Sequence, residues 1–508
     1  MCILGFLLID YQLDTMLSEN QVIKLIFGFK VRYLRQQAQY SYQQLADKTG
    51  LSTSYLNDIE KGKRYPKPDK IKKLAVALHV DYNYMVATNA SKKLQPIIEL
   101  LNSKFFKLFP LEKFGISLEK LLELFTQTPD KVNAFISTIF KIARNYQVDE
   151  TQFYKEALRS YQDMHNNYFV DLEDAARSFK QEYSIKGTLP FTKAFLEDQL
   201  SELYGVVVDL AGLAEKNNLK SIRSYYSKEK KVLYIQQDLS EAQINFLVAR
   251  ELGFQYLGLE ERPYATSIIR IESFEELLNN YKASHFAAAL LMDEATLVTD
   301  IRDIARDNSW DASRLLDLLT KYNVTGEMLL QRLTNIIPHH FDLEDLFFIR
   351  LTGSKDLQTF TMTKDLHLSQ LHSPYNNELN EHYCNRWVSI SSIKELRMSN
   401  GKKEGGAILA DAQVSKYWNT DKEYLCISIA KPGFLDSTTG VSVTLGLLVT
   451  PKLKSVFHFI SDPMLKYKEV HTTCERCGIR DCEARVAPPK IIESEEATES
   501  MIRELEYL

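Results

Sequence analysis

The stretch SYQQLADKTGLSTSYLNDIE, residues 41–60, decides the fold of the N-terminal part of the chain. Ser41 and Ser52 are residue types that cap helix N-termini well, and each precedes a short run with helical spacing. Gly50 stands between the two runs, where a glycine commonly ends a helix. Two short helices joined around one glycine predict a helix-turn-helix.

The flanking sequence continues the helical pattern on both sides. Apolar residues at helical spacing predict one helix within residues 22–33 and another over residues 67–78. Residues 21–90 also hold twelve Lys and Arg against five Asp and Glu, which gives this segment +7 and, since the chain carries −5, leaves −12 for the rest. A basic segment on an acidic body indicates a nucleic-acid reader, with a solvated helical face as the alternative.

Residues 27–80 resemble the XRE (lambda-repressor-like) DNA-binding family. The positions that fall on the family pattern are Gly28, Arg32, Arg35, Leu45, Ala46, Gly50, Ser52, Leu56, Glu60, Gly62, Arg64, Pro66 and Leu74. Tyr42 departs from it, because the family usually has Gln near the start of the second helix. The resemblance implies a five-helix domain over residues 21–90, with the helix that begins at Ser52 in the major groove of double-stranded DNA.

The resemblance also implies which side chains contact DNA. The helix begins at Ser52, and its exposed early residues would reach base edges: Thr53, Ser54, Tyr55, Asn57 and Asp58. Nearby cations would bind phosphates: Arg32, Lys61, Lys63 and Arg64. Because readers of this class usually bind two half-sites, we expect a homodimer or a higher homo-oligomer.

The length of 508 residues predicts about three domains. No stretch of about 18 uncharged apolar residues is present, so we expect no membrane segment and a cytoplasmic protein. We interpret residues 1–20 as an N-terminal extension rather than a signal peptide, with translation starting at Met1 or Met16. Residues 91–190 are rich in helical spacing and are interpreted as a helical connector.

Residues 191–340 combine short β-rich runs with an amphipathic helix, SEAQINFLVARELGFQYLGL, and resemble the ImmA/IrrE-type metallopeptidase domain. The family helix carries His-Glu-x-x-His, which binds zinc through two histidines on one face. Here those positions hold Arg250, Glu251 and Phe254, and the acidic positions of a later helix hold Asn280 and Lys282. We therefore expect a degenerate domain that is not an enzyme. His285 is interpreted as a packed residue, not a ligand.

Residues 341–490 are β-rich and predict an antiparallel or mixed sheet with helices. Near their end, Cys474, Cys477 and Cys482 have C-x₂-C-x₄-C spacing, which aims thiolates at one ion. Cys384 is the best candidate for the fourth ligand, with His471 and Cys426 as runners-up. Zinc and a [4Fe–4S] cluster both fit these ligands, and three unrelated buried cysteines are the alternative.

The whole order resembles the short-chain fatty acyl transcriptional regulator family. The stretch CERCGIRDCEARVAPP, residues 474–489, and YCNRW, residues 383–387, carry this likeness. The resemblance implies a regulator of fatty-acid or propionate-type carbon metabolism. Such a regulator would bind an acyl-CoA effector in its C-terminal half. The segment GKKEGGA, residues 401–407, is a weak phosphate-loop candidate and reads more simply as a hairpin loop. Residues 491–508 form an acidic tail.

The fold class that follows is mostly α, with an α+β C-terminal half. From the N- to the C-terminus, the sequence predicts a helix-turn-helix domain, a helical connector, a degenerate metallopeptidase-like domain and a β-rich sensor that ends in a Cys-rich metal knuckle. The function that fits this order is a sequence-specific DNA-binding transcriptional regulator that responds to an acyl-CoA-type effector. An Fe–S redox-sensing transcription factor is the alternative, and a regulatory metallopeptidase is a third reading.

Overall fold

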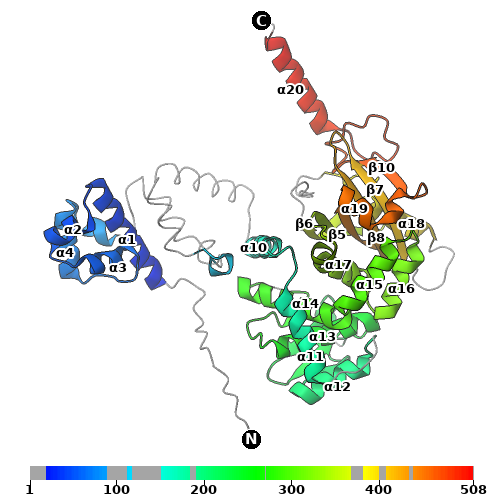
Figure 1. The fold of residues 1–508 in the computed structure, drawn as a ribbon, viewed down its shortest axis with the longest axis horizontal. Coiled ribbons are helices and arrows are strands. Elements are labelled where there is room, and N and C mark those ends of the chain that lie inside the picture. The colour runs from blue at the N-terminus through cyan, green and yellow to red at the C-terminus, as the bar shows by residue number, and fades with distance from the viewer. Residues whose placement is uncertain are drawn as a thin grey trace. The chain divides into compact units, whose positions relative to one another are not determined.

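The computed structural model describes residues 19–87, 111–116, 150–183, 190–214, 216–268, 270–367, 381–399, 408–433 and 439–506. The chain divides into two compact units, residues 1–161 with 270–274 and residues 162–269 with 275–508 (Figure 1). Among the described residues, no helix is long and apolar enough to cross a membrane. Each unit is considered by itself below.

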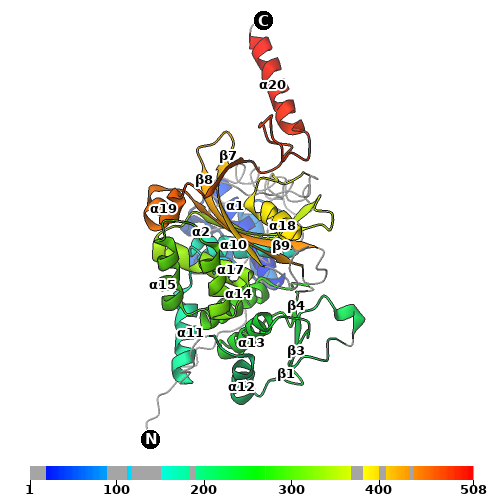
Figure 2. The ribbon, with the colours of Figure 1, turned by 90° about the vertical axis from the view of Figure 1, so that its right-hand side faces the viewer.

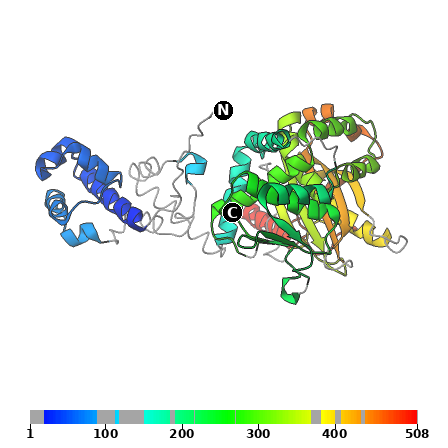
Figure 3. The same ribbon diagram turned by 90° about the horizontal axis from the view of Figure 1, so that it is seen from below.

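The first unit contains a bundle of short helices, drawn in blue in Figure 3. The helices are α1 (Glu19–Gln37), α2 (Tyr42–Thr49), α3 (Thr53–Glu60), α4 (Pro68–Ala77) and α5 (Tyr82–Val86). The 3₁₀ helix η1 (Leu111–Phe114) and most of α10 (Glu150–Met164) belong to the same unit. The predicted helix-turn-helix is confirmed as α2, a turn and α3.

Local chemistry fixes the bounds of α2. The Ser41 side chain accepts from the Gln44 backbone N–H at 3.1 Å, and the Gln44 amide oxygen accepts from the Ser41 N–H at 2.8 Å, which is a capping box. At the other end, Gly50 adopts φ 68°, a conformation that costs a glycine little. The chain can therefore turn sharply between the two helices.

Helices α1 to α5 share one small core, with Leu45, Leu56, Ile59 and Leu74 fully buried. Gly28 lets α1 approach α3 closely, because a Cβ there would lie 2.1 Å from the backbone oxygen of Ile59. Phe27 and Val31 of α1 and Met85 of α5 join the same core, which therefore holds the five helices together.

The second unit begins with a helical layer and a small sheet. Its first elements are α11 (Val170–Glu182), α12 (Lys193–Tyr204), β1 (Val207–Asp209), η2 (Asn217–Leu219), β2 (Ser224–Ser227), β3 (Val232–Ile235), α13 (Glu241–Tyr256) and β4 (Ala265–Thr266). The strand order is β1-β3-β2-β4, with β1 and β3 parallel and the other pairs antiparallel. Four helices follow: α14 (Phe274–Leu291), α15 (Glu294–Ala305), α16 (Ala312–Tyr322) and α17 (Gly326–Phe341).

A six-stranded sheet forms the rest of the unit. Its elements are β5 (Leu346–Gly353), β6 (Phe360–His367), α18 (Val388–Ser399), β7 (Leu409–Tyr417), β8 (Glu423–Pro432), β9 (Gly440–Leu448), α19 (Pro451–Val456), η4 (His458–Ser461) and β10 (Lys466–Val470). The order is β10-β7-β8-β9-β5-β6, and only the β10–β7 pair is parallel. The sheet is therefore mixed, one of the two predicted possibilities.

The two faces of this sheet belong to different cores. Side chains of one parity, such as Phe348, Ile427 and Leu445, join the large core formed with the preceding helices. Side chains of the other parity, such as Phe347 and Cys426, pack beneath α18. Figure 2 shows the sheet between α18 and the layer that contains α17.

Two predicted boundaries look different in the structure. Residues 170–183 are part of the sequence interpreted as a connector, but Ala176 and Phe179 of α11 lie in the large core of the second unit. The same core runs from α12 into the six-stranded sheet, so residues 191–340 and 341–490 are not packed as separate bodies. The acidic tail forms α20 (Lys490–Glu506), which has no buried residue.

Candidate functional site

The residues expected to read bases lie on α3. Ser52 caps this helix by accepting from the backbone N–H of Tyr55 at 3.2 Å. Thr53 and Ser54 are exposed on the first turn, and Asn57 is half-buried one turn later. The N-terminal part of α3 therefore presents polar side chains to solvent, as a recognition helix does.

Tyr55 and the side chains around it are linked to one another. Lys70 Nζ lies 4.2 Å from the centre of the Tyr55 ring, and the Arg64 guanidinium lies 5.7 Å from it. Arg64 Nε also lies 3.1 Å from Asp58 Oδ2. Tyr55 thus packs between cations, and Arg64 is positioned at the end of α3 by a carboxylate of that same helix.

The other expected phosphate contacts lie on two elements. Lys63 is exposed and Lys61 half-buried in the loop after α3. Arg32 is half-buried on α1, which packs against α3, and its charge acts to lower the pKa of Tyr42. Arg32 is therefore close to the start of α2, on the helix-turn-helix itself.

Tyr42, which departs from the family pattern, has a structural role that the sequence did not reveal. Its hydroxyl donates to Glu60 Oε2 at 2.7 Å, and Arg35 donates to both Glu60 oxygens at 2.6 and 2.8 Å. Burial, followed by the bond to Glu60, raises the pKa of Tyr42 to about 12. These three side chains join α1, α2 and α3, and fix the angle at which α3 is displayed.

The degenerate peptidase-like site is built around an arginine. Glu251 on α13 accepts from Arg262 through both oxygens, at 2.8 and 2.5 Å. The Arg262 guanidinium lies 3.5 Å from the centre of the Phe254 ring, and all three residues are buried. In His-Glu-x-x-His, positions 251 and 254 would carry the general base and the second zinc ligand. The Arg262 guanidinium therefore contacts both of the positions that serve the metal in the peptidase family.

The other three positions, 250, 280 and 282, also lack a side chain of the type that binds zinc in the family. Arg250 donates to Ser224 Oγ at 3.3 Å and to Thr266 Oγ1, so it connects α13 to β2 and β4. Burial lowers its pKa to about 10, which leaves it cationic at neutral pH. Asn280 and Lys282 are half-buried on α14 and supply no carboxylate. The side chains at positions 250, 280 and 282 therefore include no carboxylate and no imidazole.

His285 lies in a buried cluster of charged groups. Its Nε2 is 2.7 Å from Glu173 Oε1, and Arg332 donates to both oxygens of Glu173. Although burial opposes it, the hydrogen bonds from Arg332 and His285 hold the pKa of Glu173 well below its usual range. Burial lowers the pKa of His285, which favours the neutral imidazole. The cluster joins α11, α14 and α17.

The four cysteines expected to bind a metal come from two segments that meet. Tyr383 and Thr473 form an antiparallel bridge, and the N–H of Cys474 donates to the His382 oxygen at 2.8 Å. Cys384, Cys474 and Cys477 are each 5% exposed, Cys482 is half-buried, and all four thiols are free. Burial raises the pKa of the Cys384 thiol to about 11.

Arg485 organises the loop that carries three of these cysteines. Its guanidinium donates to the backbone oxygens of Cys474, Cys477 and Ile479 at 2.8, 2.9 and 2.8 Å. Within the described ranges, no group of three or more His, Cys, Asp or Glu side chains has the geometry of a metal site. Cysteine thiolates are donors that suit zinc or an iron–sulfur cluster. The fold brings the four thiols near one another, but not in the arrangement that metal ligands have.

The two runners-up for the fourth ligand have other surroundings. His471 Nδ1 lies 3.1 Å from the Thr472 hydroxyl, and Cys426 lies on β8 beneath α18. Burial raises the pKa of Cys426 to about 12, as expected for an inert packed thiol. Residues 401–407 lie outside the described residues.

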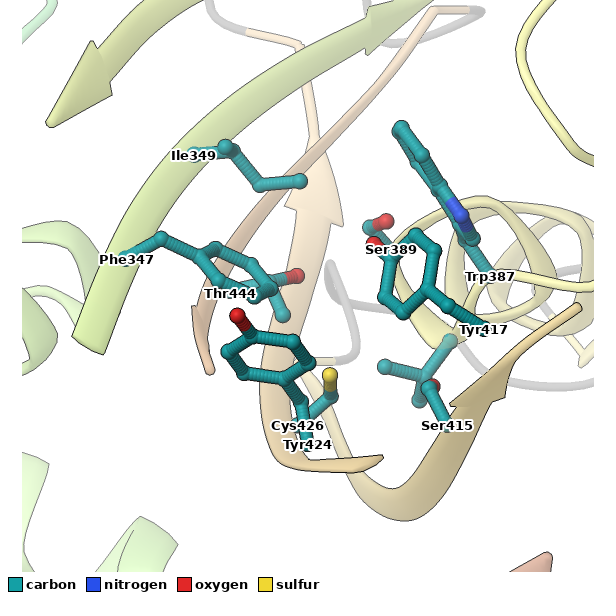
Figure 4. Close-up of a pocket in the computed structure, with 10 residues that line it drawn as sticks. Phe347, Ile349, Trp387, Ser389, Ser415, Tyr417, Tyr424, Cys426 and Thr444 are labelled. Carbon is teal, nitrogen blue, oxygen red and sulfur yellow. The ribbon is translucent and has the colours of Figure 1, made fainter. Parts of the chain in front are cut away.

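An apolar pocket with a cavity volume of about 20 Å³ lies between α18 and the sheet, next to the cysteines. Figure 4 shows Phe347 and Ile349 of β5 facing Trp387 and Tyr417 across it. Trp387 also donates from its indole to the His471 oxygen at 2.8 Å and from its backbone to the Cys384 oxygen at 3.0 Å. One side chain therefore touches both the pocket and the two segments that carry the cysteines.

Comparison with known proteins identifies two parts of the chain. Residues 31–85 match the family model described as Helix-turn-helix, and residues 204–334 match the IrrE N-terminal-like domain. The chain therefore contains an XRE-type helix-turn-helix domain and an IrrE-like domain, as the sequence predicted. The likeness to the short-chain fatty acyl regulator family has no counterpart in these matches.

Two curated relatives match the N-terminal part. The chain is 44% identical over 62 residues to the Uncharacterized HTH-type transcriptional regulator RghRB of Bacillus subtilis, covering 12% of this chain and 45% of that one. It is 46% identical over 57 residues to the HTH-type transcriptional repressor RghR of the same organism, covering 11% and 42%. The chain thus spans less than half the length of the curated relatives it matches.

A solved structure described as a Mycobacterium tuberculosis transcriptional regulator aligns with 66% of this chain and 94% of its own, at 17% identity and a TM-score of 0.46.

Proposed function

We propose that this protein is a sequence-specific DNA-binding transcriptional regulator. The observation that carries the proposal is α3, a capped helix with exposed Thr53 and Ser54 on the first turn, in a segment that carries +7. The matched relatives are an HTH-type regulator and an HTH-type repressor, which supports the same reading. Side chains of α3 read base edges in the major groove, and cations around it bind phosphates.

The recognition helix is held by the rest of its domain before DNA arrives. Glu60 at the end of α3 is bound by Arg35 and Tyr42, so the helix need not be ordered on binding. Pre-organisation of this kind lowers the entropic cost of association. Two copies that present α3 to neighbouring major grooves would read two half-sites, so the proposal includes a homodimer.

We propose that the IrrE-like domain catalyses no hydrolysis. Zinc-dependent hydrolysis needs a metal that lowers the pKa of a bound water, and Arg262 stands at that place, paired with Glu251. A second cation in contact with this guanidinium would be repelled. Residues 204–334 therefore act as a scaffold for the regulator.

For the effector, we propose an acyl-CoA-type molecule bound in the C-terminal half. The apolar pocket beneath α18 supports this, since an acyl chain seeks an apolar environment. The cavity is small, so the pocket must widen to receive a chain. Trp387 would report the change to the cysteine segments, because its indole and backbone bind both of them.

We propose further that Cys384, Cys474, Cys477 and Cys482 bind zinc or a [4Fe–4S] cluster, which would fasten residues 381–387 to residues 471–485 when bound. An Fe–S redox sensor is the second candidate for the signal that the protein detects, favoured by the burial of three of these thiols together. Native mass spectrometry of protein purified without oxygen, with its absorption spectrum, distinguishes the two. One zinc per chain without colour would exclude the redox reading.

DNA binding is tested by footprinting on the protein's own promoter region and by fluorescence anisotropy at fixed salt. We expect binding there to be much tighter than to random DNA. Asn57→Ala should weaken specific binding about tenfold or more and relax base preference, whereas Lys63→Ala should weaken all sequences alike. Lys72→Ala, an exposed lysine on α4, is the control of equal charge change. Equal affinity for specific and random DNA would refute the proposal.

A further inference from the structure

A larger cavity lies on the face of the six-stranded sheet opposite the Trp387 pocket. Its volume is about 330 Å³, which is within the range of small-molecule sites. Ile429 and Lys431 of β8 line it together with Val441 and Val443 of β9, and the first turns of α13 and α17 close the other side. The cavity therefore stands where the IrrE-like helices meet the sheet, inside one compact unit.

Lys431 is the cation of this cavity. Burial lowers the pKa of its amine, which reflects the cost of holding the charge away from water. Among the residues that the structure describes, the Lys431 amine forms no hydrogen bond or ion pair, although Glu327 lies near enough to act on it electrostatically. A partly buried ammonium group without a bonded partner gains from an anion.

The charges around Lys431 also favour an anion. The nearby carboxylate, Glu327, is already bound by other cations: Lys364 Nζ lies 3.3 Å and Arg350 Nε 3.4 Å from its oxygens. Arg223 acts on Lys431 as a further positive charge. One carboxylate among four cations leaves the region with a net positive charge. The attraction of a bound anion to these cations therefore exceeds its repulsion by Glu327.

The shape of the cavity is fixed by close packing. At Gly326, the first residue of α17, a Cβ would lie 2.6 Å from Ile429 Cγ2, so the helix rests directly on the strand. Val441 is directly opposite Lys431 in the β8–β9 register, which places an apolar wall beside the ammonium group. The walls therefore offer two charged groups, Lys431 and the cation-bound Glu327, with polar side chains of Ser240, Gln243 and Thr325 and an apolar surface.

We propose that this cavity binds a small organic anion, whose carboxylate or phosphate pairs with Lys431 and whose apolar part lies against Val441, Val443 and Ile429. The site is separate from the Trp387 pocket and does not rest on the proposed DNA binding. Such a ligand would bridge the IrrE-like helices and the sheet.

Isothermal titration calorimetry of the full-length protein without DNA tests this proposal. Hexanoate and hexyl phosphate are the two anionic probes, and hexanamide is the neutral probe of similar size. We expect at least one anion to bind at least tenfold more tightly than hexanamide, since a hydrogen bond to a charged group contributes about 1.5–3 kcal/mol. The stronger anion identifies which head group the site takes.

Matched variants locate the binding. Lys431→Gln should weaken the anion about tenfold or more, Lys431→Arg should retain it, and Val441→Phe should abolish binding by filling the cavity. Lys454→Gln, an exposed lysine on α19, should change nothing. Circular dichroism confirms that each variant is folded. The proposal is overturned if neither anion binds the wild type at millimolar concentration, or if Lys431→Gln and Val441→Phe bind like the wild type.

Discussion

Glu251 and Arg262 show at the scale of single residues how a site can keep its shape without its chemistry. The carboxylate of Glu251 remains on α13 where a general base would stand, but both of its oxygens are bound by Arg262. The guanidinium is held in turn against the Phe254 ring. The pair is buried, and removing one charge would leave the other without a partner.

Glu251→Gln should therefore destabilise the second unit by about 3–5 kcal/mol, the usual cost of breaking a buried ion pair. Glu260→Gln, an exposed carboxylate nearby, is the control and should change stability by less than about 0.5 kcal/mol. Urea unfolding followed by circular dichroism measures both. Equal stability of the two variants would contradict the structural role given to Glu251.

The His285 cluster predicts a dependence of stability on pH. Because the pKa of His285 is lowered in the fold, the unfolded chain binds more protons below about pH 6.5, and stability falls as the pH drops through that value. The pKa of Glu173 is also lowered, so a further loss begins below about pH 4.5. Both shifts destabilise the unit in acid.

His285→Asn should flatten the decline in melting temperature between pH 7 and pH 5. His458→Asn, at an exposed histidine of η4, should leave the slope unchanged. Parallel curves for the wild type and His285→Asn would show that the buried imidazole does not carry this proton linkage.

Part of these sites could be predicted from the sequence. Arg250 and Phe254 were enough to predict the loss of zinc ligands, since neither side chain can bind the metal. The partner of Glu251 was missed, because Arg262 stands eleven positions later in a loop that has no motif. Tyr42 stands out in the sequence only as a departure from the family pattern, because it is the fold that brings its hydroxyl to Glu60. Long-range polar partners leave no periodic signal in a sequence.

At the scale of the elements, the start of α3 contains two serines, Ser52 and Ser54, that have different roles. The Ser52 side chain is used to cap the helix, whereas Ser54 is exposed on the first turn. Ser52→Ala should therefore destabilise the first unit by about 1 kcal/mol. Ser54→Ala should leave stability nearly unchanged and weaken specific DNA binding, if it reads a base as proposed.

Thermal unfolding and anisotropy titrations on both variants distinguish the roles. A stability loss for Ser54→Ala equal to that for Ser52→Ala would contradict the assignment.

The helix starts and ends were predictable, because caps and glycines act locally. The strand order of the six-stranded sheet was not, since β10 returns to pair in parallel with β7 across some fifty residues.

For the whole molecule, β10 and α20 should respond differently to truncation. Without residues 466–508, β7 would become an unprotected sheet edge, so we expect that chain to aggregate. A chain that ends at Glu493 loses most of α20, which has no buried residue, and should remain soluble with an unchanged melting temperature. Size-exclusion chromatography measures both outcomes, and a monodisperse product of the first truncation would refute the edge argument.

The bridge between Tyr383 and Thr473 also sets an order of events during synthesis. Cys384 leaves the ribosome about ninety residues before Cys474, so the two segments cannot meet until residue 474 has been translated. An ion that binds all four thiols, as proposed, can be loaded only after Cys482 has also been translated. If the four cysteines bind an ion as we propose, a chain cut short before residue 474 would still display its N-terminal helices but would lack three of the four thiols, and so could not be metallated.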